Sequence, residues 1–310
     1  MGNITAVLFR QDILVFMGVN ILLAWGVYLA FATGQISLGH GAFMAVGAYA
    51  SGIFTVKLGL PLPLAMVVAL VTSGTFGILV GFPALRIPGL QLMIATMGIA
   101  EMVRTFFRNV EYVGGNEGFP GLRGTTVILV YATVFVCLIF MWKLSRSRMG
   151  QAFRAIEMDE QAATAMGLNT TYLKVLAFGL GSAIAALGGA LYAHYVYIIE
   201  PDHFNITQSF IIALFIVLGG GQNFWGPAIG AIIITLLPEY LRAFDQYRFI
   251  IYGAILMIMM VIRPEGLISN SALRTLSRHW DLLSRWLSPW LSRIRTRVVI
   301  GSPPGATPLP

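Results

Sequence analysis

The stretch Ile13–Thr33 reads ILVFMGVNILLAWGVYLAFAT and contains no Asp, Glu, Lys or Arg. The hydrocarbon core of a bilayer is about 30 Å thick and an α-helix rises about 1.5 Å per residue, so about 20 apolar residues can cross it. This stretch is long enough and apolar enough to do so. It predicts a membrane-spanning helix near the start of the chain.

Eight further apolar runs follow along the chain. The second, seventh and eighth of the nine runs are short, and a short run can form a half-helix that does not cross. The pattern predicts an all-α protein, a polytopic integral membrane helical bundle of about eight or nine membrane helices with short or broken segments. The eight further runs are Ala42–Leu58, Leu62–Phe82, Leu90–Phe107, Thr125–Trp142, Leu173–Ile198, Phe204–Leu218, Ala228–Tyr240 and Phe249–Ile262.

The composition agrees with a membrane protein. Of the 310 residues 57% are hydrophobic and 11% are charged, and the mean hydropathy is +0.79. Soluble domains carry about 25% charged residues, and a soluble domain of this size could not bury so much apolar surface. The net charge of +7 indicates cytoplasmic loops that face anionic membrane lipid, and not nucleic acid. The single cysteine, Cys137, can form no intrachain disulfide.

Positive charge falls on one side of the membrane if each of the nine runs crosses once. It gathers in the segment Lys143–Lys174, in the chain after Ile262, and at Arg86 between the third and fourth runs. The side with the excess of Lys and Arg is the cytoplasmic one. Nine crossings then place the N-terminus in the periplasm and the C-terminus in the cytoplasm.

Two breaks between runs are rich in glycine and nearly uncharged. The first break, Gly34–Gly41, reads GQISLGHG, and the second break, Gly219–Pro227, reads GGGQNFWGP. Polar backbone at membrane depth is tolerated only where protein or a water-filled cavity satisfies it, and such paired interruptions often point to a translocation path. Two ordinary tight loops at the membrane surface are the alternative, with His40 as a satisfied loop residue. The candidate path residues in the breaks are Ser37, Gly39, His40, Gly41, Gly219, Gly220 and Gly221.

An ionisable pair lies inside the fourth run. Glu101 and Arg104 are separated by three positions, so they share one face of a helix. Ionisable side chains at that depth are costly and usually face the protein interior. The pair is a candidate for the translocation path, on the pore side or at a gate. The alternative is a structural ion pair that steadies the bundle near its outer end.

The segment Gly150–Thr171 falls on the predicted cytoplasmic side. It is rich in Ala, Glu, Gln and Met, which favour a helix, and Gly167 is a natural helix stop. Small residues at Ala162, Ala163 and Ala165 form a ridge that lets this helix approach another surface closely. A solvated linker helix is the alternative.

Six stretches carry a more specific signal. They are SLGHGAF at Ser37–Phe43, TMGIAEMVR at Thr96–Arg104, VGGNEGFPGL at Val113–Leu122, RAIEMDEQAATAMGLN at Arg154–Asn169, VLGGGQNFWGPAIGA at Val217–Ala231 and RPEGL at Arg263–Leu267. In this order and spacing the chain resembles the branched-chain amino-acid type of ABC transporter permease, the LivM-like family. The resemblance covers roughly residues 12–268.

The resemblance implies a permease subunit of an ATP-driven importer that moves amino acids, of the branched-chain class, across the bacterial inner membrane. Permeases of the same type for urea, amides or other amino acids are the alternative. The implied partners are a second related permease subunit, two ATPase subunits and a periplasmic substrate-binding protein.

The resemblance also implies a transmembrane permease domain over residues 1–270, with a cytoplasmic coupling segment, 144–173, that docks on an ATPase subunit. The implied coupling residues are Arg154, Glu157, Asp159, Glu160, Ala162, Ala163 and Gly167. The tail 271–310 lies beyond the resemblance, and its pattern predicts a basic amphipathic to disordered cytoplasmic segment.

The chain contains no Gly-Lys dipeptide, so the P-loop that cradles ATP phosphates is absent. ATP hydrolysis must then belong to another polypeptide. We predict a transport subunit that is not an enzyme and has no cofactor, catalytic residue or metal site. An ion-coupled secondary transporter is the less favoured alternative, because it would normally show more intramembrane acidic residues than Glu101.

Overall fold

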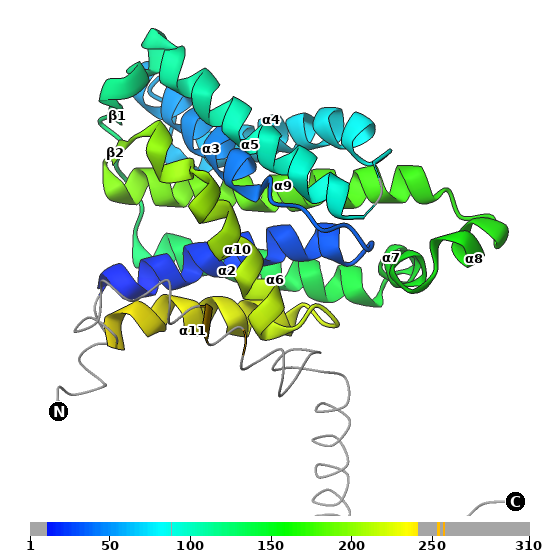
Figure 1. The fold of residues 1–310 in the computed structure, drawn as a ribbon. Coiled ribbons are helices and arrows are strands. Elements are labelled where there is room, and N and C mark those ends of the chain that lie inside the picture. Colours follow the sequence, from blue (N-terminus) through cyan, green and yellow to red (C-terminus); the bar gives the residue numbers. More distant parts are fainter. Residues whose placement is uncertain (1–10, 88, 241–252, 255–256, 258–310) are drawn as a thin grey trace, which may run out of the picture. The chain divides into compact units, whose positions relative to one another are not determined.

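The computed structural model of the chain describes residues 11–87, 89–240, 253, 254 and 257. The described part is built of helices with one short strand pair (Figure 1), which confirms the predicted all-α membrane bundle. In chain order the elements are α2 (Gln11–Phe31), α3 (His40–Gly52), the π-helical η1 (Ile53–Lys57), α4 (Leu62–Ala84), α5 (Leu90–Asn109), η2 (Glu111–Val113), η3 (Gly115–Glu117), β1 (Phe119–Pro120), α6 (Val127–Arg146), α7 (Arg148–Met158), α8 (Glu160–Ala165), α9 (Thr170–Val196), β2 (Ile198–Ile199), η4 (Pro201–Phe204), α10 (Ile206–Gly219) and α11 (Trp225–Tyr240).

Six helices in the described residues are long and apolar enough to cross a membrane: α2, α4, α5, α6, α9, and α10 taken together with η4. The three runs predicted to be short are short, since α3, α10 and α11 have 13, 14 and 16 residues. The ninth predicted run lies almost entirely outside the described residues, and the tail 271–310 lies wholly outside them.

Helix α9 is the centre of the bundle and packs against α2, α3 and α4. The apolar windows of α2 and α9 are 83% and 72% buried, whereas those of α5 and α6 are each 22% buried. Glycine makes this packing close. A Cβ on Gly47 of α3 would collide with the backbone of Ala186, and a Cβ on Gly181 would collide with the carbonyl oxygen of Gly26. Small residues at helix contacts allow such approach in membranes.

The two ends of the bundle carry different elements (Figure 1). At one end β1 pairs antiparallel with β2, with Phe119 opposite Ile199 and Pro120 opposite Ile198. This pairing joins the connection between α5 and α6 to the connection between α9 and α10. Helices α7 and α8 lie at the other end (Figure 1). The predicted coupling segment and the predicted periplasmic connections are therefore at opposite ends of the molecule.

Candidate functional site

The predicted coupling segment folds as two short helices held by successive side-chain caps. Ser147 Oγ accepts a hydrogen bond from the Gly150 amide at the start of α7, 3.2 Å. Asp159 Oδ1 accepts from the amide of Ala162, 3.0 Å, and begins α8. Gly167 ends the turn after α8 with a φ of +86°, which glycine adopts without strain. Asp159, predicted as one of the acidic residues beside the ridge, is therefore the cap that separates two helices.

The ridge of small residues divides between the inside and the outside of the protein. Ala163 is 2% exposed and faces the chain itself, whereas Ala162 and Ala165 are exposed. On either side of α8 stand Met158 and Met166, which are 85% and 84% exposed. We call Met158, Ala162, Ala165 and Met166 the docking face. Flexible, polarisable methionines are typical of surfaces that bind another protein.

The two methionines were not among the predicted coupling residues. A signal was present in the sequence, because Met158 and Met166 bracket the alanine ridge in an otherwise polar segment. Residue type alone does not decide whether a methionine on a short helix faces the bundle or the solvent. Only the position of the cap at Asp159, and the burial of Ala163, fix which way this face points.

The charged residues of the coupling segment make contacts within the chain. Glu160 forms a salt bridge with Lys174 at the start of α9, 2.6 Å. Burial raises the pKa of the Glu157 carboxyl, and the neighbouring Arg154 guanidinium partly offsets that effect. Arg154 lines a pocket between α2, α6 and α7. Glu160 and Arg154 therefore help to fix the segment against the bundle.

The first break is buried and hydrogen bonded to two other helices. Ser37 and His40 are 3% and 1% exposed. The Leu38 amide donates to Thr96 Oγ1 of α5, 3.0 Å, and the Gly41 amide donates to Ser209 Oγ of α10, 3.2 Å. The break therefore joins α2 and α3 to α5 and α10, and its polar backbone is satisfied by protein.

His40, the first residue of α3, lies among aromatic rings. Its ring centroid is 5.5 Å from that of Phe43 and 6.3 Å from that of Phe178. Both edge-on contacts are of the kind that stabilises buried aromatic pairs. The neighbouring Gly39 amide donates to Ser37 Oγ, 3.1 Å. These contacts give His40 a fixed position in the first break.

The second break is a tight hairpin between α10 and α11. A Cβ on Gly219 would collide with the backbone of Gly226, and a Cβ on Gly226 would collide with the carbonyl oxygens of Gly219 and Gly220. Gly220 has a φ of +95°. The predicted path residues Gly219 and Gly220 are buried and Gly221 is half-buried, so the break is packed against the bundle.

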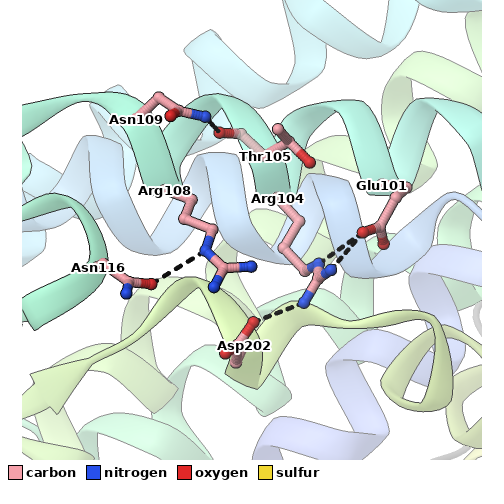
Figure 2. A network of polar contacts seen from close by, with 7 residues as sticks. All are labelled: Glu101, Arg104, Thr105, Arg108, Asn109, Asn116 and Asp202. Atoms are coloured by element: carbon pink, nitrogen blue, oxygen red, sulfur yellow. Dashed lines mark hydrogen bonds and ion pairs between the residues drawn. The ribbon is translucent and has the colours of Figure 1, made fainter.

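The pair Glu101 and Arg104 belongs to a larger polar network (Figure 2). Arg104 Nε donates to Glu101 Oε1, 2.9 Å, and the same guanidinium bridges to the carboxylate of Asp202 in η4. Further along α5, Arg108 Nε donates to Asn116 Oδ1, 3.0 Å. The network ties α5 to η4, as the structural alternative for this pair requires.

Thr96 connects this network to the first break. It bonds Leu38 and precedes Glu101 by five positions on α5, a distance of about 7.5 Å along a helix axis. A line of polar groups therefore runs along α5 from Leu38 and Thr96 to Asp202. The second break does not share contacts with this line; its printed contacts are to α2.

The described residues contain no group of three or more His, Cys, Asp or Glu side chains placed to hold a metal ion. His194 instead contacts Thr55 Oγ1, 2.8 Å, and the Ala190 carbonyl oxygen, 2.8 Å. His203 interacts with the backbone of Glu200 at the start of η4. The histidines of this part of the chain thus serve helix contacts and caps.

Comparison with known proteins gives a consistent result. Residues 9–262 match the family described as permease component of branched-chain amino acid transport systems. The high-affinity branched-chain amino acid transport system permease protein LivM of Salmonella typhimurium is 29% identical over 294 residues, which covers 83% of this chain and 69% of that protein. The corresponding protein LivH of Escherichia coli is 26% identical over 169 residues, 54% of each chain. The galactofuranose transporter permease protein YtfT of Escherichia coli is 27% identical over 271 residues, 80% of this chain and 77% of that one. No solved structure matches the chain.

Proposed function

Because the chain belongs to the family of permease components of branched-chain amino acid transport systems, we propose that it is one of two permease subunits of an ATP-driven amino-acid importer. It is a multi-pass inner-membrane protein and a transport component. In the proposed complex it pairs with a second, related permease, with two ATPase subunits in the cytoplasm and a substrate-binding protein in the periplasm.

The docking face is the observation that carries the proposal. A surface with two methionines more than four-fifths exposed is costly on a solvated linker, because exposed apolar groups of this size favour association. Caps at Ser147, Asp159 and Asn169 fix the helices that present it. A rigid, apolar, protruding surface at one end of the bundle is suited to a groove on an ATPase subunit.

Helix α5 supplies the proposed face toward the second permease. α5 and α6 have equal buried shares, 22%, but α5 is the least apolar of the six spans and α6 the most apolar. Lipid accommodates the exposed face of α6, whereas the line from Thr96 through Glu101 and Arg104 is poorly suited to lipid. We propose that this side of α5 lines the translocation path, between the two permeases.

The substrate that we propose is a branched-chain amino acid. LivM and LivH carry this substrate class in their names, and the match to LivM spans 83% of the present chain. The match to YtfT shows that similar permeases also serve a sugar importer, so the substrate class rests on the family description and on LivM. Urea, amides and other amino acids are the alternative substrates of the proposed importer.

Reconstitution tests the proposed function. The chain is placed in liposomes alone, and then with the second permease, the two ATPases and the binding protein, and uptake of labelled leucine is measured. We expect uptake only in the full complex and only with ATP, because the chain lacks a P-loop. Uptake by the lone chain under an ion gradient would instead identify a secondary transporter.

The proposed orientation places α7 and α8 in the cytoplasm and the β1–β2 end in the periplasm. Single cysteines at the exposed positions Gln161 and Glu117 are introduced after Cys137→Ala, which removes the only native thiol. In intact spheroplasts an impermeant thiol reagent should label position 117 and leave position 161 unlabelled until the membrane is permeabilised. The reverse pattern would invert the topology.

A further inference from the structure

Three functional segments meet at the end of α2. Helix α2 runs to Phe31 and leads directly into the first break at Gly34. The second break and helix α7 both contact its last turns. We call Trp25, Tyr28, Phe31 and Gly34 the α2 junction.

The second break is fixed to the α2 junction by a buried hydrogen bond. Trp25 Nε1 donates to the carbonyl oxygen of Phe224, 2.9 Å, and the two residues are 2% and 5% exposed. The ring of Phe31 lies directly against Gly221, where any Cβ would collide with it. A shift of α2 must therefore carry the second break with it or break these contacts, since packed interiors have little free space.

Helix α7 reaches the α2 junction from the coupling segment. Phe153 and Arg154 line one pocket with Tyr28, and the Arg154 guanidinium acts electrostatically on the Tyr28 hydroxyl. Gly34, with a φ of +74°, lies beside the last turn of α7, where its Cβ would stand 3.8 Å from Glu157 Cα. Helix α7 thus touches α2 and the first residue of the first break.

From these contacts we infer that the α2 junction transmits movement of the coupling segment to both glycine-rich breaks, with Trp25 as the positioning residue that holds the second break. The inference rests on the proposed function and names the route inside this subunit. Docking of an ATPase displaces α7, α7 shifts the end of α2, and both breaks follow. Coupling between sites needs a physical connection whose equilibrium both sites bias, and α2 supplies a rigid one, with its apolar window 83% buried.

Trp25→Phe tests the route, because it keeps an aromatic ring and removes the indole N–H. The control is Asn20→Leu on the same helix. Asn20 Nδ2 donates to Thr235 Oγ1 of α11, also 2.9 Å, and Thr235 retains its own bond to the Ala231 carbonyl oxygen when Asn20 is lost. Both variants remove one hydrogen bond of equal length between α2 and the α10–α11 region, but only Trp25 contacts the second break.

The measurement is the ratio of leucine imported to ATP hydrolysed in the reconstituted full complex. We expect Trp25→Phe to lower this ratio about fivefold or more, with ATPase assembly unchanged, and Asn20→Leu to keep it within about twofold. Tyr28→Phe, which removes only the hydroxyl on the α7 side, should lower it as well and serves as the second variant if Trp25→Phe does not assemble. Equal ratios for Asn20→Leu and the folded junction variants would overturn the route. Absence of ATP-driven import by the wild-type complex would overturn the proposed function itself.

Discussion

A complex carrying Ala162→Trp should lose its ATPase subunits during purification of the permease. Ala162 is exposed on α8, on the docking face between Met158 and Met166. A bulky side chain forced into a packed interface costs about 1–3 kcal/mol, and each 1.4 kcal/mol weakens binding about tenfold. We expect co-purification of the ATPases, and their stimulation by loaded binding protein, to fall about tenfold or more. A solvated linker would change by no more than about 0.5 kcal/mol.

Two further variants separate docking from folding. Ala163 is 2% exposed, so Ala163→Trp overpacks the permease itself and should lower the thermal stability of the isolated subunit. Ala162→Trp should leave that stability unchanged. The double variant Met158→Ser, Met166→Ser should weaken ATPase binding without a clash, because it removes the apolar anchors of the docking face. Wild-type amounts of ATPase with Ala162→Trp would exclude the docking face as the ATPase site.

Gly219→Ala should destabilise the second break and stop transport. A Cβ at this position would collide with the backbone of Gly226 across the hairpin, and backbone atoms cannot rotate away as a side chain can. Overpacking of this kind costs about 1–3 kcal/mol, occasionally more. We expect a lower melting temperature of the isolated permease and a loss of leucine uptake in the full complex. Gly226→Ala should behave in the same way, because the close approach is reciprocal.

Gly98→Ala is the matched control. Gly98 lies in the middle of α5 and a Cβ there would meet nothing within 4 Å. Alanine is favoured over glycine in a helix by about 1 kcal/mol, so this variant should melt at the wild-type temperature or slightly above it. If Gly219→Ala and Gly98→Ala melted alike, the close contact between α10 and α11 would not limit the second break.

The membrane helices were predictable from sequence because lipid imposes a length. The run Ile13–Thr33 corresponds to α2, Gln11–Phe31, and an apolar stretch of that length has few other structures available. The separation of α7 from α8 was not predictable in the same way. Asp159 stands in a stretch of good helix formers, and its role as a cap depends on a local backbone turn that propensity does not specify.

The candidate site was predictable only where its contacts are local. Glu101 and Arg104 pair because a helix brings positions three apart onto one face. Their third partner, Asp202, is 98 positions from Arg104, and no local rule links such positions. The bond from Trp25 to Phe224 spans 199 positions and ends on a backbone carbonyl. Any residue type offers that acceptor, so the sequence holds no mark of it.

The central position of α9 has a consequence for how the chain is made. Helices α2, α3 and α4 all use α9 as a packing partner, yet α4 ends at Ala84 and α9 ends at Val196. At about 5–20 residues per second of synthesis, the early helices wait on the order of 10 s for that partner. During this interval the faces around Gly26 and Gly47 lie against lipid or the insertion machinery. The ribosome therefore delivers the bundle as separate inserted helices, and its core assembles within the bilayer only after α9 arrives.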